Sequence, residues 1–326
     1  MTVIGIDPGA GAIKLYGPGG GVQVPAILAV DEGHTLGRMA GLAQRKPPLR
    51  VRTENGAFFI GAGAHEWGRP LSEDLDHDRF TGSPELRAVL VAGLTSYAAA
   101  VSALAEPLSV YLGLPLEALS EEAGAVADGV RRWLVGTHAW QADGKPLSAT
   151  VEAVRITSQA AGALFDYLLD DAGAFVPARK AHFDKEIGVI SVGMNTVELL
   201  VTRSGAPQDR FTAGRTAGVR RLLDLLNPGG LYSLGELDTQ LRAGKLDTAA
   251  ALPVWEREVI SFVERRWGHA HKRFAAVIVV GGGALLLRQG LTARFNARAY
   301  VPDDPVLATA RGLYKLAALN AARRRS

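Results

Sequence analysis

The chain has 326 residues, of which 48% are hydrophobic and 21% charged, and this balance excludes a largely disordered protein. It contains no cysteine, which excludes disulfides, thiolate nucleophiles, zinc fingers and iron–sulfur clusters. Its 36 Lys and Arg against 33 Asp and Glu give a net charge of +3, too small for a dedicated nucleic-acid binder. No run approaches the roughly 18 apolar residues of a membrane span, and no basic leader precedes the first apolar run. We therefore expect a cytoplasmic protein, with room for two domains.

The first half of the chain predicts a strand hairpin, a long helix and a second hairpin. Residues 3–6 and 13–16 are typical of short strands on either side of a glycine turn. Behind Ser83-Pro84, apolar residues at helical spacing predict a long core helix over 85–104. The next predicted elements are a buried strand over 108–112, a hairpin pairing 132–140 with 148–156 across Asp143-Gly144, and a helix over 158–169.

The opening pattern returns in the second half. Residues 187–192 and 196–201 again flank a glycine turn, Gly193-Met194-Asn195. Two such hairpins, each at the head of half the chain, indicate two related α/β halves. The remaining predicted elements are helices over 217–226 and 253–267, a buried strand over 276–280 that leads through Gly281-Gly282-Gly283 into a helix, and a final helix over about 305–322.

Each of the three glycine turns follows a predicted strand. A turn with little side chain lets backbone N–H groups point at one centre, which is how folded chains bind nucleotide phosphates. No GxxxxGK[ST] P-loop occurs, and residues 281–284 lack the spacing of the dinucleotide fingerprint. If the three glycine turns converge in the fold, they would enclose a nucleotide without a P-loop or a dinucleotide fingerprint.

These motifs resemble those of the actin, Hsp70 and sugar-kinase superfamily. Asp7-x-Gly9-x-x-x-x-Lys14 is similar to its first phosphate motif, residues 191–198 to its second, and residues 279–284 to its adenosine motif. Gly113-Leu114-Pro115, the hairpin at 143–145 and the segment 216–222 resemble the actin-like proteins of the ParM/StbA type.

The resemblance implies an α/β, two-domain actin-like (ribonuclease H-like) fold with a nucleotide cleft between the domains. Domain I would comprise residues 1–157 plus 306–326, and domain II residues 158–305. The cofactors implied are ATP, or GTP, and Mg²⁺.

The resemblance also implies roles for single residues. Asp7 would hold Mg²⁺ through water and act in catalysis, while Gln159 would orient the attacking water. The implied nucleotide-binding residues are Gly9, Gly11, Lys14, Gly193, Asn195, Thr196, Gly281 and Gly282. From the residues alone, other readings stay open: Asp7 could cap a turn, Lys14 could lie on the surface, Gln159 could simply begin a helix, and the glycines could serve ordinary hairpins.

Ser191 departs from the family pattern, because the second phosphate motif normally opens with Asp. A hydroxyl cannot give the outer shell of a metal ion the negative charge of a carboxylate. We therefore expect slow hydrolysis, with a nearly inert nucleotide-binding filament protein as the alternative. Glu198 places an acid at the end of the second phosphate motif, and we assign it no role.

The implied function is an actin-like ATPase that polymerises into filaments on binding ATP and Mg²⁺, for plasmid or DNA segregation or another cytoskeletal role. Its partners would be further copies of itself and a DNA-binding adapter protein, with no direct contact to nucleic acid or membrane. One alternative is a small-molecule kinase of the same superfamily, for which we identify no base beyond Asp7. The other is a structural filament or nucleotide sensor with little hydrolysis, which Ser191 favours.

Other groups of residues give weaker signals. The acidic cluster Asp74, Asp76, His77 and Asp78 is typical of a solvated turn, and His269 with His271 is a weak metal-binding candidate. Four tryptophans at 133, 140, 255 and 267 are predicted to be core or interface residues. The basic runs at 265–273 and 323–325 indicate solvated surface, with a contact to a polyanion or to another copy as the alternative.

Overall fold

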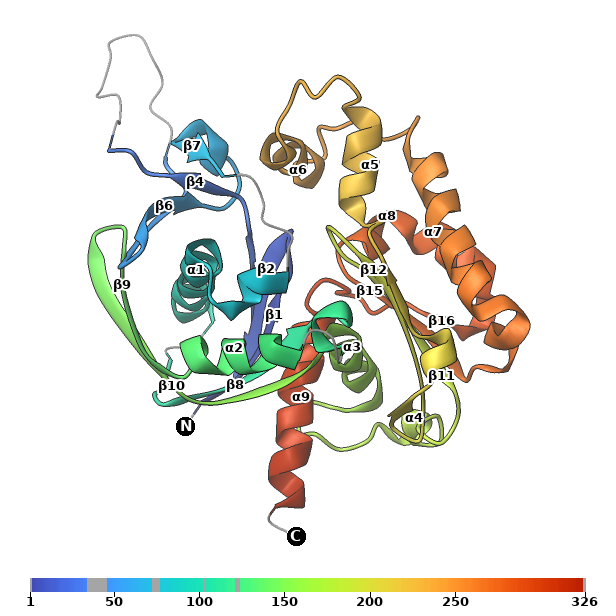
Figure 1. Cartoon of the computed structure of the whole chain (residues 1–326). Coiled ribbons are helices and arrows are strands. Elements are labelled where there is room, and N and C mark those ends of the chain that lie inside the picture. Colours follow the sequence, from blue (N-terminus) through green and yellow to red (C-terminus); the bar gives the residue numbers. More distant parts are fainter. Residues whose placement is uncertain (1, 34–45, 72–76, 102–103, 121–123, 325–326) are drawn as a thin grey trace.

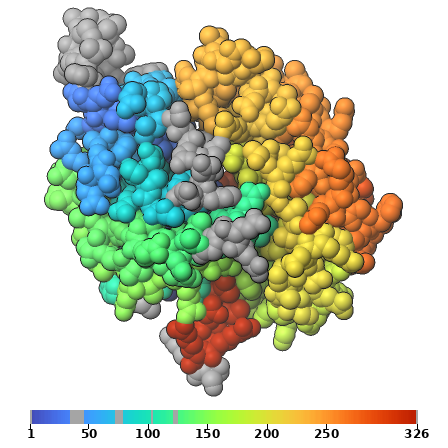
Figure 2. Space-filling view, viewed as in Figure 1, coloured from blue at the N-terminus to red at the C-terminus, as the bar shows by residue number. Residues whose placement is uncertain are grey.

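A computed structural model describes residues 2–33, 46–71, 77–101, 104–120 and 124–324. It contains two β-sheets side by side, each covered by helices, and we call each sheet with its own helices a lobe (Figure 1). In the space-filling view the first lobe (blue to green) and the second lobe (yellow to orange) divide the visible face (Figure 2). No helix in the described part of the chain is long and apolar enough to cross a membrane.

The sheet of the first lobe has the strand order β3-β2-β1-β8-β10-β9-β5-β6-β4-β7. Its strands are β1 (Thr2–Pro8), β2 (Ala12–Gly17), β3 (Gly20–Pro25), β4 (Leu28–Val30), β5 (Leu49–Thr53), β6 (Gly56–Ile60), β7 (Arg69–Pro70), β8 (Leu108–Leu114), β9 (Gly136–Ala142) and β10 (Lys145–Ser158). β1 pairs antiparallel with β2 and parallel with β8. The central strand β8 is buried along its whole length, as expected for a parallel strand covered on both faces.

The sheet of the second lobe repeats this arrangement. Its path is β13 (Ala206–Pro207), β12 (Val197–Arg203), β11 (Ile187–Val192), β15 (Ala276–Val280) and β16 (Ala299–Tyr300), with β14 (Ala213–Arg215) paired to β12. β11 pairs antiparallel with β12 and parallel with β15, as β1 does with β2 and β8. Each lobe thus begins with a hairpin whose first strand continues into a parallel sheet, and the predicted pair of related halves is confirmed.

Helices fill the space around the two sheets. They are α1 (Pro84–Ala100), α2 (Gly124–Leu134), α3 (Gln159–Leu168), α4 (Pro177–Lys180), α5 (Val219–Leu226), α6 (Leu234–Arg242), α7 (Leu252–Trp267), α8 (Gly283–Phe295) and α9 (Ala308–Arg323). Short 3-10 turns are η1 (Ala64–Glu66), η2 (His77–Thr81), η3 (Glu117–Leu119), η5 (Asp209–Phe211), η6 (Gly268–Arg273) and η7 (Asn296–Arg298). One core joins α1 and α2 to the first sheet, and another joins α5, α7 and α8 to the second.

Several sequence signals are confirmed in place. The Ser83 hydroxyl caps α1 by accepting a hydrogen bond from the Leu86 N–H at 3.2 Å, with Pro84 in the first turn. Trp140, Trp255 and Trp267 are buried in the lobes, while Trp133 is partly buried against the first core.

One boundary is wrong. Residues 132–134, predicted as the start of a hairpin strand, form the last turn of α2, and β9 begins only at Gly136. Gly136 has a φ of 129°, a conformation that few other residues adopt, so the chain can turn sharply there from helix to strand. The predicted turn at Asp143-Gly144 is present, but β10 pairs with β9 only as far as Val151, and its residues 153–158 pair with β8.

Helices α3 and α9 connect the lobes, crossing between the two sheets (Figure 1). α3 packs against β11 and β15, whereas α9 packs against β1 and β8. At the crossing a Cβ atom on Gly312 would lie only 1.8 Å from the Gly162 carbonyl oxygen. The division into residues 1–157 plus 306–326 and 158–305 stays a prediction.

Ion pairs between α3 and α9 also fix this helix crossing. The Arg311 guanidinium donates two hydrogen bonds to the buried Asp166 carboxylate, at 2.7 and 2.6 Å, and Lys315 adds a third at 2.9 Å. Bidentate Arg–carboxylate pairs have a defined orientation, so this group holds the register of the two helices. The lobes are therefore joined through a close, oriented contact.

We expect Gly312→Ala to destabilise the protein by about 3 kcal/mol, because the added methyl must push α3 and α9 apart in a packed core. The free energy of unfolding in urea measures this. Gly229→Ala is the matched control, since a Cβ atom there meets nothing within 4 Å. Equal stability of the two variants would contradict the close crossing.

Candidate functional site

A cavity of about 580 Å³ lies between the lobes, where the turns of the two hairpins face each other. All of the predicted site residues line it: Asp7, Gly9, Gly11, Lys14, Gln159, Gly193, Asn195, Thr196, Gly281 and Gly282. Ser191 lines it as well. The structure thus brings together residues from both lobes and from the helix that connects them, in a space large enough for a nucleotide-sized ligand.

The Asp7 carboxylate stands at the centre of the charged groups. It is 6% exposed at the end of β1, and its Oδ2 lies 3.1 Å from the Lys14 ammonium. Asp7 and Lys14 face each other across β1 and β2, so their side chains share one face of the hairpin. The other carboxylate oxygen, Oδ1, accepts a hydrogen bond of 2.7 Å from the Gln159 amide. A carboxylate, an ammonium and an amide therefore meet at one point on the cavity wall.

Gln159 is positioned by the start of α3. The Ser158 hydroxyl caps this helix by accepting a hydrogen bond from the Ala161 N–H at 3.0 Å. Because Ser158 ends β10 and Gln159 is the first residue of α3, the amide is placed where the first lobe passes into the connecting helix. Any movement of α3 moves this amide relative to Asp7.

The turn of the second hairpin is fixed to the start of α5. The Gly193 N–H donates to the Thr196 carbonyl at 2.9 Å, and the Gly193 carbonyl accepts from the Val219 N–H at 3.0 Å. Asn195 Oδ1 is buried in the cavity wall and has no hydrogen-bond partner among the described residues. Buried polar atoms normally have partners, so this oxygen is suited to a donor group on a ligand or water.

The two hairpin turns touch each other. A Cβ atom on Gly11 would lie 2.8 Å from the Met194 Cβ, closer than real side chains approach. The absence of a side chain at Gly11 therefore lets the hairpin turns of both lobes approach the same space.

The third glycine turn closes the cavity at the start of α8. Gly281 has a φ of 93°, and its N–H donates to the Pro305 carbonyl at 2.8 Å. A Cβ atom on Gly281 would lie 2.3 Å from the Val192 carbonyl oxygen, whereas one on Gly282 would meet nothing within 4 Å. Gly281 is thus required by the backbone, and Gly282 leaves open space in which a flat ring can lie against the chain.

Glu198 is the direct cross-strand partner of Ser191 on β12 and β11. It is 2% exposed, and its Oε1 accepts a hydrogen bond of 2.9 Å from the Leu116 N–H of the first lobe. Its Oε2 is buried with no partner in the described part of the chain. Burial raises the pKa of Glu198 to about 8, and the negative charges of Glu117 and Asp7 add to the effect. At neutral pH Glu198 is therefore mainly protonated and does not replace the charge that Ser191 lacks.

Helix α6 contributes site residues that the sequence analysis missed. Arg242 donates a hydrogen bond of 2.9 Å to the Gly11 carbonyl of the first lobe and pairs at 2.8 Å with Asp238. Asp238 is 3% exposed, and burial raises its pKa although the Arg242 charge opposes the shift. The sequence Ser233-x-x-Glu236 is a capping box and could have revealed the helix. Its contact with Gly11 could not be read from the sequence.

The residues fit a magnesium ion that arrives with a nucleotide. Within the described ranges, no three His, Asp or Glu side chains are grouped as a metal site, and this includes His269 and His271. In the described lining of the cavity the acids are Asp7, beside the glycine turns, and Asp238, which is paired with Arg242. Mg²⁺ keeps most of its waters and is commonly bound by one or two carboxylates together with substrate phosphates, so a single acid is sufficient here. The acidic cluster at 74–78 lies outside the residues whose side chains are described.

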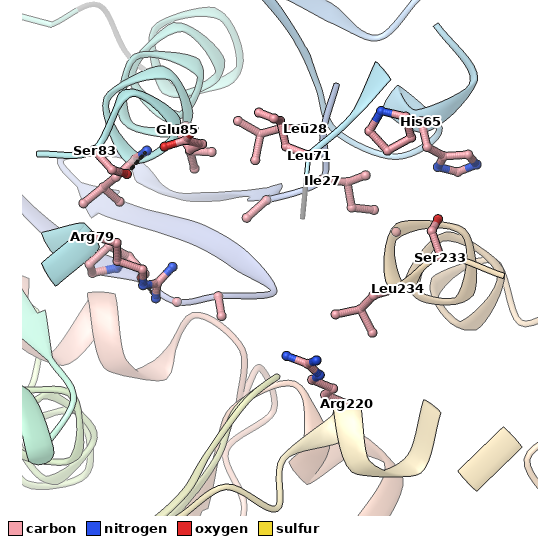
Figure 3. A pocket seen from close by; sticks show the side chains of 18 residues that line it. Ile27, Leu28, His65, Leu71, Arg79, Ser83, Glu85, Arg220, Ser233 and Leu234 are labelled. Atoms are coloured by element: carbon pink, nitrogen blue, oxygen red, sulfur yellow. Dashed lines mark hydrogen bonds between the residues drawn. The ribbon is translucent and has the colours of Figure 1, made fainter. Parts of the chain in front are cut away.

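A second cavity of about 360 Å³ adjoins the first beyond the Gly9 turn. Ile27, Leu28 and Leu71 of the first lobe face Leu234 of α6 across it, while Arg79 and Arg220 approach from the two lobes (Figure 3). The cleft between the lobes therefore continues from the glycine turns toward their outer ends.

Comparison with known proteins agrees with this geometry. The family model described as the N-terminal domain of actin-like proteins matches residues 5–162. No curated protein matches the chain.

Solved structures are similar over the whole length. The apo psk41 ParM protein is 16% identical with a TM-score of 0.73, covering 100% of this chain and 99% of that one. A 15-stranded ParM filament from Clostridium botulinum is 17% identical with a TM-score of 0.70, and the match covers 97% of this chain and 98% of that one. The archaeal actin homologue Ta0583 in complex with ADP is 17% identical with a TM-score of 0.69, and the match covers 99% of this chain and 100% of that one. These similarities confirm the expected two-domain actin-like fold.

We expect Glu198→Gln to remove a loss of stability that the natural chain shows as pH rises. Between about pH 5 and pH 8 the unfolded chain releases the Glu198 proton while the folded chain keeps it, so the free energy of unfolding falls with rising pH. Glutamine cannot ionise and avoids this fall.

Urea unfolding at pH 5 and pH 8 measures the effect. The two proteins should differ little at pH 5, and the variant should be the more stable at pH 8. Glu152→Gln, at an exposed carboxyl on β10, should follow the natural chain at both values. If the difference in free energy of unfolding between Glu198→Gln and the natural chain does not increase from pH 5 to pH 8, the result would contradict a protonated Glu198.

Proposed function

We propose that this actin-like protein, whose fold is that of ParM, binds ATP or GTP with Mg²⁺ in the cavity between its lobes, hydrolyses it slowly, and assembles into filaments in the bound state. The observation that carries the proposal is the meeting of three glycine turns and the Asp7, Lys14 and Gln159 side chains on one cavity. Nucleotide phosphates require backbone donors, a positive charge and a carboxylate for the metal, and these groups supply all three. The ADP complex of Ta0583, which has a similar fold, supports a nucleotide as the ligand.

The proposed chemistry is positioning and electrostatic stabilisation. Lys14 places its charge beside the phosphates, and the Gly9 and Gly193 turns offer backbone N–H groups. Asp7 would hold a Mg²⁺ ion through water, and the ion would supply positive charge to the phosphates. The Gln159 amide either breaks its hydrogen bond to Asp7 or keeps it, and in both cases it would hold a water in line with the terminal phosphate. An amide is sufficient for this role because phosphoryl transfer depends little on a strong base.

Coupling to assembly follows from the place of the cavity between the lobes. A ligand that contacts both hairpin turns binds the closed arrangement better than an open one and so shifts the population toward it. Closure changes the outer surface, because α3 and α9 join the lobes at one crossing. Head-to-tail contacts that do not close on themselves then generate a filament. The filament structure of the similar Clostridium botulinum ParM supports this part of the proposal.

The proposed cellular role is segregation of plasmid or other DNA, or another cytoskeletal task, in the cytoplasm. Net charge of only +3 gives little attraction to DNA, so the cargo would be held through a DNA-binding adapter protein.

A filament protein or nucleotide sensor with little hydrolysis is a second candidate. Ser191 favours it, because the end of β11 brings a hydroxyl in place of a carboxylate to the cavity and Glu198 is held neutral by burial. No observation favours a small-molecule kinase: in the described lining of the cavity, the acids are Asp7 and Asp238, and each is paired with a basic side chain.

We expect Asp7→Asn to abolish both assembly and phosphate release with ATP and Mg²⁺, because it removes the carboxylate beside the glycine turns that would hold the metal. Sedimentation with ATP, with ADP and without nucleotide, together with a phosphate-release assay, measures both. Asp128→Asn, at an exposed acid on α2, should behave like the natural chain. Assembly that persists unchanged in Asp7→Asn would count against a nucleotide-driven process.

Ser191→Asp is expected to raise the rate of phosphate release about 10-fold, the size of effect typical of outer-shell ligands of a metal. The neutral Glu198 opposite lets a second acid be added with little repulsion. Ser191→Asn, which has nearly the same shape but no charge, should stay near the natural rate. Equal rates for the two variants would show that Ser191 does not limit hydrolysis.

A further inference from the structure

The second cavity, of about 360 Å³, has a wall largely of its own. Of the described residues that line the two cavities, only Gly9, Ala10 and Arg79 are common to both. The volume lies in the range of small-molecule sites, and both lobes contribute to the wall. A ligand held by the glycine turns of the first cavity therefore does not account for the second.

Much of this wall is apolar. Its aliphatic side chains come from the first lobe and from α6, and they are Ile27, Leu28, Leu71, Leu86, Val89 and Leu234. Ile27 is 6% exposed and lies close to the backbone of α6, where a Cβ atom on Gly235 would come within 3.0 Å of its Cγ2. Figure 3 shows Ile27 and Leu71 on one side of the space and Leu234 on the other. An apolar group placed here would leave water and contact both lobes.

Arg220 brings a positive charge into this apolar space. It lies in the first turn of α5, is half-buried and extends into the cavity (Figure 3). Its guanidinium has no hydrogen-bond acceptor and no ion-pair partner among the described residues. The neighbouring Arg221 differs, because its guanidinium donates to the Glu258 carboxylate at 3.0 and 2.9 Å. Guanidinium groups bind carboxylates and phosphates strongly, so Arg220 is suited to an anionic ligand.

The other polar groups of the wall favour an anion over a cation. Arg79 of the first lobe approaches the same space, with its guanidinium carbon 4.5 Å from the centre of the Phe80 ring. Within the described lining the one acid is Glu85, in the first turn of α1. The buried Nδ1 of His65 also has no hydrogen-bond partner in the described part of the chain. Two guanidinium groups against one carboxylate give the described lining a net positive charge.

We propose that this second cavity binds a small organic anion with an apolar body, such as a medium-chain carboxylate. The acidic group of the ligand pairs with Arg220 and Arg79, and its apolar chain lies among the aliphatic side chains of the wall. Inorganic phosphate would leave those side chains uncovered, and a neutral apolar ligand would bury the Arg220 charge without a partner. Because the ligand contacts both lobes, its binding stabilises their present arrangement. The inference does not depend on the ligand of the first cavity.

Titration calorimetry of the full chain with octanoate tests the proposal. We expect one octanoate per chain, bound more tightly than about 1 mM. Acetate and inorganic phosphate lack the apolar chain and octanol lacks the charge, so each should bind at least about 10-fold more weakly.

A charge variant tests the role of Arg220. Arg220→Gln should weaken octanoate binding about 10-fold, because it removes a charged hydrogen-bond donor from the cavity. The matched control is Arg132→Gln, at an exposed arginine of α2 that is not among the residues described as lining the cavity. It should bind octanoate like the natural chain.

A second variant tests the apolar part of the site. Leu234→Trp places a larger side chain in the cavity and should abolish octanoate binding, while urea unfolding shows whether the variant is folded. If it is not folded, Arg220→Gln decides the question. ATP with Mg²⁺ should not displace octanoate from the natural chain, since the two cavities share so little of their walls.

The inference is overturned if the natural chain does not bind octanoate, or if Arg220→Gln and Arg132→Gln bind it equally well. Binding of acetate, phosphate or octanol as tight as that of octanoate would also overturn it. So would displacement of octanoate by ATP, which would place octanoate in the first cavity. A chain that binds octanoate as expected but no nucleotide would contradict the proposed function and support this inference.

Discussion

The crossing of α3 and α9 holds the two lobes in their relative orientation. Without a Cβ atom at Gly162 and Gly312, the two helices meet backbone to backbone, and the Asp166–Arg311 pair fixes their register. α3 packs against the second sheet and α9 against the first, so this contact decides how the β1–β2 and β11–β12 hairpins face each other. It also places Gln159, the first residue of α3, against Asp7. The cavity is a consequence of that geometry.

Within the cavity, charge is distributed unevenly. Asp7 lies 3.1 Å from the Lys14 ammonium, whereas burial keeps Glu198 mainly protonated and Ser191 brings only a hydroxyl. A single carboxylate can hold the waters of a metal ion, but it stabilises the ion less than a pair would. The proposed function therefore combines nucleotide binding with slow hydrolysis, and in the proposed filament slow hydrolysis prolongs the assembled state.

Local patterns predicted much of the fold and the glycine turns that line the cavity, because each glycine turn sits beside its own strand and Gln159 beside its helix cap. The boundary at 132–134 was wrong since helix and strand both suit those residues until Gly136 turns the chain. The contacts of Arg242 with Gly11 and of Glu198 with Leu116 could not be predicted. They join residues far apart in sequence, and only the packing of the lobes brings them together.

A crystal structure with a non-hydrolysable ATP analogue and Mg²⁺ would show whether the cavity between the lobes holds a nucleotide. We expect one nucleotide there, with its phosphates against the Gly9 and Gly193 turns, its base against Gly281 and Gly282, and the metal ion beside Asp7. An analogue bound elsewhere, or contacting one lobe alone while the turns stay apart, would contradict this expectation.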